Sequence, residues 1–304
     1  MKKSFLLMIA AGLFAFGCND PIPSPDPSPS PTDPEPEVKN IPIRLSTDIS
    51  SKATDVSYEV GDQVGIYTVN YENGESSSLA DSGNYLDNIL FTYNGDEWTP
   101  EKEVYWKDQV TPADFYCYYP YQNSLSSASA LRFTTQADQS SIENYKQSEL
   151  LWGKATGVMP SSDPVRITTR HMLSNLIIYV KPGDGYTEES LAEEDITVTV
   201  TGLKTVAQLN ISTGKVTAEG SPDNITPYRE NDYWRALIVP QDVVGAELVQ
   251  VTVGEDSYSL VQTVTFESNR QYKCTITINR IGGGVNIGIG GWDVDDTDLG
   301  GVVS

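Results

Sequence analysis

Short stretches of alternating apolar and polar residues recur along this chain, and such alternation is typical of β-strands with one buried face. The stretch richest in aromatics, residues 114–121, holds five aromatic rings in eight positions. Aromatic side chains favour pleated, half-buried surfaces, and this many cannot all face water. We therefore expect a central strand covered on both faces and closed by Pro120, which has no N–H to donate. One face would carry Phe115, Cys117 and Tyr119, and the other Tyr116 and Tyr118.

The rest of the pattern predicts further short strands separated by Gly, Pro and Asn, with a surface loop over residues 72–88 and one helical turn over 141–147. Ser190 and Glu193 fit a capping box on a second short turn. The long 3.6-residue periodicity of a catalytic α/β domain does not occur, so the pattern indicates an all-β fold. The predicted strands cover residues 41–49, 64–69, 89–93, 97–99, 104–106, 114–119, 131–134, 150–153, 165–180, 196–200, 206–216 around a turn at 212–214, 233–241, 248–253, 258–266, 273–278 and 285–292.

The first 39 residues differ from the rest. Lys2 and Lys3 precede a short apolar run that ends in Ala-Phe-Gly before Cys18, which is the pattern of a secretory signal. The cysteine at this place resembles a bacterial lipobox, and the resemblance implies that Cys18 becomes the lipidated first residue; a plain secretory signal is the alternative. Prolines two or three positions apart follow up to residue 39 and favour a stiff polyproline II stalk on the order of 50 Å long.

Length and turn signals predict two domains. The 304 residues suffice for two cores. Residues 159–164, in which Pro160 and Pro164 flank polar residues, are the predicted joint between the two domains. We therefore expect a signal peptide over residues 1–17, a lipidated cysteine and Pro-rich linker over 18–39, one β-sandwich over 40–158, and a second over 159–304 that includes a terminal strand.

Charge and rare residues narrow the possible functions. The chain has 20 Lys and Arg against 42 Asp and Glu, a formal net charge of −22, which disfavours nucleic acid and anionic lipid surfaces as partners. His171 is the single histidine, so a multi-His metal site is excluded. Cys117 and Cys274 lie in phase with apolar neighbours and are expected to be buried, with an interdomain disulfide as the alternative.

Four aspartates near the C-terminus are the candidate metal ligands. A calcium loop that begins at Asp293 would need Gly at its sixth position, where Asp298 stands, and Glu at its twelfth, where Ser304 stands. The mismatch indicates a solvated acidic tail. We expect no metal, no cofactor and no enzymatic activity, and an enzyme would require a cleft with perturbed acids or an open His171.

At this point the residues resemble a family. Residues 61–67 (GDQVGIY), 115–121 (FYCYYPY) and 148–153 (SELLWG) are similar, in order and spacing, to successive markers of the fimbrillin-like pilins, the lipoprotein pilus subunits of gut and oral anaerobes. His171 with Leu-Ser close behind, and the Val-Pro-Gln at 239–241, extend the resemblance over roughly residue 40 to the end. The family implies two tandem Greek-key (transthyretin-like) β-sandwiches and a structural, hydrogen-bonded His171.

The resemblance also implies a way of assembling. In this family a protease removes the first strand, and the C-terminal strand of the next subunit fills the groove. Here the removed strand would be residues 41–49, with cleavage near Lys52 and Ala53, although the family commonly has Arg where Lys52 stands. The donor would be residues 285–289, whose apolar side chains alternate with Asn and Gly; the alternative is that this segment is the last strand of its own domain. The donor residues are Val285, Ile287 and Ile289.

The resulting prediction is a pilus subunit or minor fimbrial component at the outer membrane and cell surface. Its partners would be other pilin subunits, the membrane through the lipid, and a receptor on a host or bacterial surface. If the first strand stays in place, a base subunit or standalone lipoprotein results. The alternative function is an unpolymerised surface lipoprotein that binds glycan or protein ligands. Candidate glycan contacts are Trp98, Trp106, Trp234 and Trp292.

Overall fold

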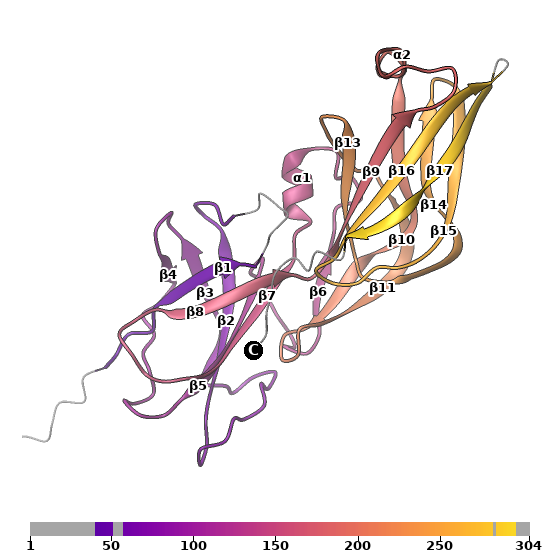
Figure 1. The fold of residues 1–304 in the computed structure, drawn as a ribbon. Coiled ribbons are helices and arrows are strands. Elements are labelled where there is room, and N and C mark those ends of the chain that lie inside the picture. Colours follow the sequence, from indigo (N-terminus) through magenta and orange to yellow (C-terminus); the bar gives the residue numbers. More distant parts are fainter. Residues whose placement is uncertain (1–39, 51–56, 282–283, 296–304) are drawn as a thin grey trace, which may run out of the picture. The chain divides into compact units, whose positions relative to one another are not determined.

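The computed structural model describes residues 40–50, 57–281 and 284–295, with side chains up to residue 280. Every described residue belongs to one compact unit, Asn40–Ser304. Among the described residues, strands dominate and two short helices occur (Figure 1). The predicted all-β class is confirmed, while the Greek-key connections stay a prediction.

Seven strands form the first sheet, in the order β1-β8-β7-β5-β2-β3-β4. The strand rich in aromatics is β5, and it lies in the middle of this sheet and ends before Pro120, as predicted. The Asn94-Gly95 hairpin joins β3 to β4, also as predicted. All neighbours in this sheet are antiparallel except β1 and β8, which are parallel. The bounds are β1 Leu45–Ile49, β2 Gln63–Asn70, β3 Leu86–Tyr93, β4 Trp98–Pro100, β5 Ala113–Tyr119, β7 Leu151–Val158 and β8 Val165–His171.

Both faces of β5 are buried, and the two faces belong to different cores. Phe115 and Cys117 pack into one core with Val64 and Ile167, and Tyr119 packs partly against it. The second core, on the other face, holds the remaining two rings of the strand, Tyr116 and Tyr118. The predicted division of the strand into two faces is therefore confirmed.

The backbone of Gly65 in β2 lies directly against the ring of Tyr118 in β5. A Cβ atom on Gly65 would lie 2.2 Å from the ring of Tyr118, which is fully buried. Glycine is required here for lack of room. The Tyr118 hydroxyl donates to Asn88 Oδ1 at 2.6 Å, and Asn88 adopts a positive φ of 48° inside β3. The hydrogen bond thus fixes the far end of the ring that Gly65 accommodates.

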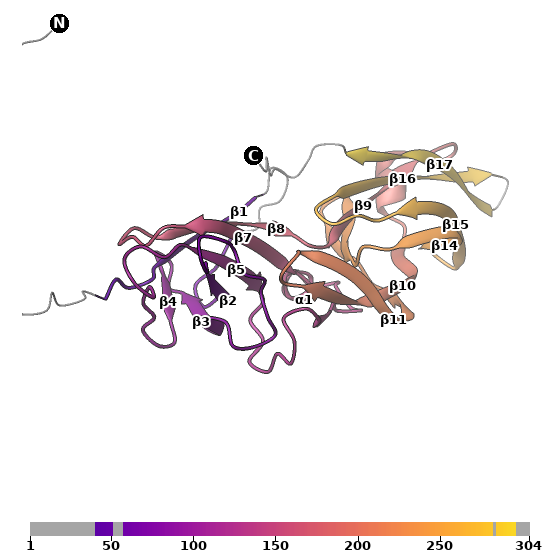
Figure 2. The ribbon, with the colours of Figure 1, turned by 90° about the horizontal axis from the view of Figure 1, so that it is seen from below.

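β6 and the strands from β9 onward form two five-stranded sheets. One contains β11-β10-β14-β15, with β6 paired to β10, and the other runs β12-β13-β9-β16-β17. In Figure 2 these sheets form two layers, with β9, β16 and β17 in one and β10, β14 and β15 in the other. Their inner faces enclose the third core, which includes Leu176, Leu203 and Cys274. The bounds are β6 Leu131–Thr134, β9 Ser174–Pro182, β10 Ile196–Asn210, β11 Lys215–Ile225, β12 Tyr228–Glu230, β13 Tyr233–Ile238, β14 Asp242–Val253, β15 Asp256–Thr265, β16 Gln271–Ile281 and β17 Gly284–Asp295.

The change from one sheet system to the next does not follow the predicted joint. The single strand expected over residues 165–180 is two strands, because β8 belongs to the first sheet and β9 to the third. Met172 and Leu173, both buried in the second core, form the crossing. The boundary predicted after residue 158 falls between β7 and β8, which are hydrogen-bonded neighbours. Residues 104–106 contribute an isolated bridge instead of a strand.

Two short helices complete the described elements. α1 (Ile142–Gln147) is the helical turn that the sequence predicts, and the Ser141 side chain accepts the N–H of Asn144 at its start. α2 (Glu188–Ala192) is capped by Thr187, whose side chain accepts the N–H of Ser190. The predicted Ser190–Glu193 capping box was wrong. Ser190 is the third helical residue, and its hydroxyl accepts the Thr187 N–H at 2.9 Å.

Candidate functional site

The segment that opens the compact unit is held on both sides. The Val165 N–H, from β8, donates to the Arg44 carbonyl at 2.8 Å. On the other side, the Ile43 N–H donates to the Val104 carbonyl and the Trp106 N–H donates to the Ile41 carbonyl, both at 2.9 Å. Residues 41–45 therefore bridge β8 and the stretch that follows β4, and they close one side of the first sheet.

The side chains of this segment enter the first core. Ile43 and Leu45 are 3% and 4% exposed, because the alternation places every second side chain inward. Under them lie Val165 and Ile167 of β8 and the ring of Trp106. The Trp106 ring meets that of Phe115 edge to face, with ring centroids 5.3 Å apart. The sequence predicted this strand correctly, although its regular part, β1, begins only at Leu45.

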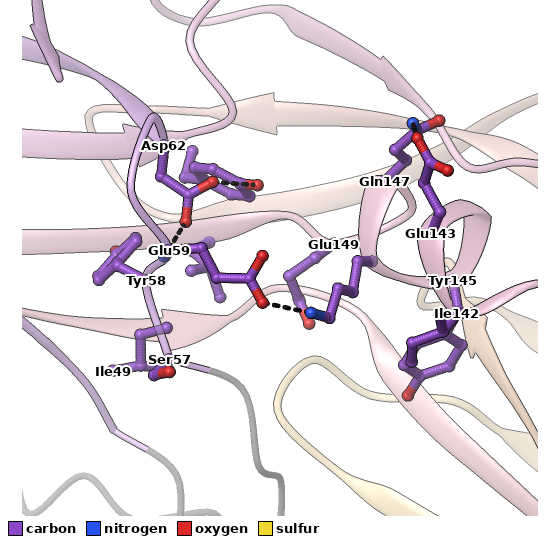
Figure 3. Close-up of a pocket in the computed structure, with 13 residues that line it drawn as sticks. Ile49, Ser57, Tyr58, Glu59, Asp62, Ile142, Glu143, Tyr145, Gln147 and Glu149 are labelled. Atoms are coloured by element: carbon purple, nitrogen blue, oxygen red, sulfur yellow. Dashed lines mark hydrogen bonds and ion pairs between the residues drawn. The ribbon is translucent and has the colours of Figure 1, made fainter. Parts of the chain in front are cut away.

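A pocket of about 420 Å³ lies next to the end of β1. Figure 3 shows Glu59 reaching across it toward α1, whose residues form the opposite wall. Ile49, the last residue of β1, and Ser57, the first described residue after residues 51–56, both line it. The full lining is Ile49, Ser57, Tyr58, Glu59, Asp62, Tyr119, Ile142, Glu143, Tyr145, Lys146, Gln147, Glu149 and Leu151.

Three of the pocket's carboxylates already have partners. Glu59 forms an ion pair with Lys146. Asp62 accepts the Glu59 N–H at 2.7 Å and the Tyr119 hydroxyl at 3.2 Å, and burial together with Asp62 raises the pKa of that tyrosine. Glu149 accepts the Leu150 N–H at 3.1 Å. Carboxylates held in this way act as structural anchors. The arrangement favours a structural role, in which this wall of the pocket holds α1 in place, and disfavours an acid–base role.

Glu149 also holds the single histidine. His171 Nδ1 lies 3.0 Å from Glu149 Oε2, and both side chains are at least nine-tenths buried. Burial lowers the pKa of His171, but the charge and hydrogen bond of Glu149 raise it by more than burial lowers it. The pKa of His171 is therefore above its ordinary value. The structure agrees with the expected structural role of His171. Sequence reasoning missed its partner, because Glu149 is 22 positions away and only the pairing of β7 with β8 brings the two together.

The tryptophans do not provide a glycan platform where the structure describes them. Trp98, Trp106 and Trp234 are 6%, 5% and 6% exposed. This corrects the prediction of exposed glycan contacts for these three rings, whose width is better used in the cores. The side chain of Trp292 lies outside the described ones. Cys117 and Cys274 are buried and free, as small apolar residues are expected to be.

The predicted processing and anchoring residues cannot be placed. Cys18, Lys52 and Ala53 lie outside the described residues. In the described backbone, the predicted donor residues Val285, Ile287 and Ile289 belong to β17 and pair with Arg280, Ile278 and Ile276 of β16. This is the position expected for the last strand of the chain's own domain.

The described part of the chain shows neither a metal-binding cluster nor a membrane-spanning helix. No group of three or more His, Cys, Asp or Glu side chains there is placed to hold a metal ion. Among the same residues, no helix has the length and hydrophobicity required to span a bilayer.

Comparisons with known proteins agree with the fold. A family model described as fimbrillin-like matches residues 51–292. A candidate fimbrium subunit, Fim1C of Bacteroides uniformis, is 24% identical over 258 residues, which cover 80% of this chain and 82% of that protein. Crystal structures of two candidate cell adhesion proteins have the same fold. The one from Bacteroides uniformis has a TM-score of 0.63 at 21% identity and covers 84% of this chain and 99% of that one. The one from Bacteroides ovatus has a TM-score of 0.66 at 17% identity, with 84% and 98% covered.

Proposed function

Because the chain belongs to the fimbrillin-like family, we propose that it is a subunit of a bacterial fimbrium that supports adhesion at the cell surface. It is exported as a lipoprotein, anchored in the outer membrane through Cys18, and assembled with other pilin subunits by exchange of strands. The name of the Bacteroides uniformis relative, a candidate fimbrium subunit, supports this assignment. Its receptor would be a molecule on a host or bacterial surface.

The observation that carries the assembly step is the double-sided attachment of the first segment. Proteolysis near Lys52 followed by loss of residues 41–49 would uncover the apolar side chains of Val165 and Ile167. It would also release the Val165 N–H on one side and the Val104 carbonyl and Trp106 N–H on the other. A groove with backbone donors and acceptors along both walls accepts an extended strand with alternating apolar side chains.

The C-terminal strand has the matching pattern. Its apolar residues Val285, Ile287 and Ile289 alternate with Asn and Gly. Three side chains of one face could therefore replace those of Ile41, Ile43 and Leu45 in the groove. Donation requires β17 to leave β16, the strand with which it pairs in the isolated chain. The exchange is therefore between two pairings of the same segment, one within the subunit and one between subunits.

Limited trypsin digestion of the chain from residue 19 onward tests the assembly step. We expect a new N-terminus at Ala53, identified by mass spectrometry, followed by a ladder of higher-order species in size-exclusion chromatography with light scattering. Lys52→Gln is the matched control and should give neither the cut nor the ladder. Ile287→Asp should be cut normally and remain monomeric, because a carboxylate cannot enter an apolar groove unpaired.

The opposite result is equally informative. A wild-type chain that is cut after Lys52, loses its first segment and stays monomeric at high concentration would overturn strand exchange. A ladder that forms equally well with Ile287→Asp would overturn the assignment of residues 285–289 as the donor.

A further inference from the structure

β15 is an edge strand of its sheet, and it lacks three features that protect sheet edges, namely short length, charged side chains after Asp256, and proline. Edge strands avoid association by being short or by carrying charges or prolines. The edge strands β4 and β12 have three residues each, and β11 contains Gly220 and Pro222. β15 has ten residues, and after Asp256 it continues for nine residues, 257–265, without a charge, proline or glycine.

The side chains of this edge fall into a buried and an exposed set. Leu260 is 3% exposed and packs into the third core, whereas Val261 next to it is 54% exposed. Ser257, Ser259 and Thr263 are exposed on the same face as Val261. In the described structure β15 pairs with β14 alone, and β17, which approaches it, is hydrogen-bonded to β16. The outer edge of β15 thus presents uncharged, mostly hydroxyl-bearing residues.

This sequence is complementary to itself in antiparallel pairing. A two-fold axis perpendicular to the sheet at Val261, the middle of residues 257–265, keeps the inward faces of both copies on the same side. Aromatic–β-branched and hydroxyl–hydroxyl neighbours of this kind stabilise a sheet, and no like charges oppose each other. The facing pairs are Val261 with Val261, Leu260 with Gln262, Ser259 with Thr263, Tyr258 with Val264, and Ser257 with Thr265.

We propose that β15 is a docking edge for a second copy of this chain, whose own β15 pairs with it antiparallel about Val261. The sheet β11-β10-β14-β15 then continues across the axis into its symmetry mate. Such a contact is lateral, and it needs neither cleavage of the first segment nor the C-terminal strand. It is therefore independent of the strand exchange proposed above and would join subunits, or filaments, side by side.

The chain's charge explains why the contact falls here and predicts its strength. Two copies with a formal net charge of −22 each repel one another. This electrostatic repulsion opposes association least along an edge that carries no charge. A single strand pair buries less than the roughly 1,600 Å² of a standard interface, so the dimer should be weak and dependent on concentration. Added salt screens the repulsion and should strengthen the dimer.

Sedimentation equilibrium of the chain from residue 19 onward, without protease, tests the proposal. We expect a reversible monomer–dimer equilibrium that shifts toward dimer as salt rises. Val261→Lys places two ammonium groups opposite each other on the axis and should make the chain monomeric. Val244→Lys is the matched control, because Val244 is also an exposed valine, 78% exposed and on the neighbouring strand β14. It should leave the dimer unchanged.

A cross-link identifies the register. Opposed Cβ atoms of an antiparallel pair lie about 4.5 to 5.5 Å apart, close enough for a disulfide after small adjustment. Val261→Cys should form a disulfide-linked dimer on mild oxidation much faster than Val244→Cys, and the native Cys117 and Cys274 are buried and do not compete.

Three outcomes would overturn the proposal. The chain could stay monomeric at high salt and concentration, or Val261→Lys could dimerise as the wild type does. Alternatively, Val261→Lys could abolish the dimer while Val261→Cys fails to link to itself; β15 would then pair with a different segment, of this copy or of another.

Discussion

At the scale of single residues, the buried pair of His171 and Glu149 links the fold to pH, because His171 is the single histidine of the chain. Their side chains are 6% and 5% exposed, and Nδ1 and Oε2 are 3.0 Å apart. Removing one partner of a buried pair leaves an uncompensated group in a medium that solvates charge poorly. The pair joins the start of β7 to the end of β8, so its protonation affects how these neighbours hold together.

We predict that this pair makes the protein less stable as the pH rises. Burial lowers the pKa of His171 but Glu149 raises it more, so the folded pKa lies above the unfolded value of about 6.5. The contribution is fully present below about pH 6.5 and is lost as the pH rises through the folded pKa. Urea unfolding should show that His171→Gln costs about 3 kcal/mol near pH 6 and less at alkaline pH.

Tyr145→Phe, in the same region, is the control for this profile. Tyr145 is buried beside Glu149 and its hydroxyl donates to Asn175 Oδ1 at 3.3 Å, so the variant loses a buried contact without losing a group that titrates near neutral pH. It should keep the wild-type slope of stability against pH. A His171→Gln variant that also keeps this slope would contradict the prediction.

At the scale of elements, the start of the short helix α2 differs between the sequence-based prediction and the structure. The sequence suggested Ser190 and Glu193, whereas the structure caps the helix with Thr187 and uses Ser190 at the third position. We predict that Thr187→Ala lowers the free energy of unfolding by about 1 kcal/mol, the usual cost of losing an N-cap. Glu193→Ala, at the exposed C-cap, should change it by less than about 0.5 kcal/mol. Chemical denaturation of both variants measures the difference, and equal costs would contradict the structure.

The elements that were predictable are those fixed by local pattern. The two faces of β5 follow from a side-chain period of two, and the β3–β4 hairpin follows from Asn94-Gly95. The break between β8 and β9 was not predictable in this way. Residues 165–180 read as one strand because no Gly or Pro interrupts them, although β8 belongs to the first sheet and β9 to the third.

The candidate site was predictable only as a strand. The alternation of Ile41, Ile43 and Leu45 indicates a buried face, and the structure places it there. The pocket beside it is built from β1, the turn at residues 58–62 and α1, and α1 is far from the other two in the sequence. Such long-range contacts leave no local signal, and the same holds for the pair of Glu59 and Lys146, which are 87 positions apart.

At the scale of the whole compact unit, the second core joins the first sheet to the strands of the second half. It contains Tyr118 of β5 together with Leu209 of β10 and Leu237 of β13. Strand pairing reinforces it, because β6 lies between β5 and β7 in the chain but pairs with β10. The side chain of Gln139 donates to the Leu237 carbonyl at 3.0 Å and accepts the Leu237 N–H at 2.8 Å.

Two further contacts cross the same region. Trp152 Nε1 donates to the Ile211 carbonyl at 2.7 Å. The guanidinium of Arg235, on β13, lies 4.5 Å from the centre of the Tyr145 ring on α1 and forms an ion pair with Glu230. A shared core crossed by buried polar contacts is costly to open, so the halves should not unfold separately.

We predict that residues 40–304 unfold in one cooperative transition. Ile167 in the first core and Leu203 in the third are matched probes, since each is 1% exposed and neither belongs to the shared core. Ile167→Ala and Leu203→Ala should each lower the free energy of the same transition by about 2 to 5 kcal/mol. Differential scanning calorimetry should then give equal calorimetric and van't Hoff enthalpies for the wild type and both variants. If each variant shifts a transition of its own and leaves another in place, the two halves are independent and the second core does not couple them.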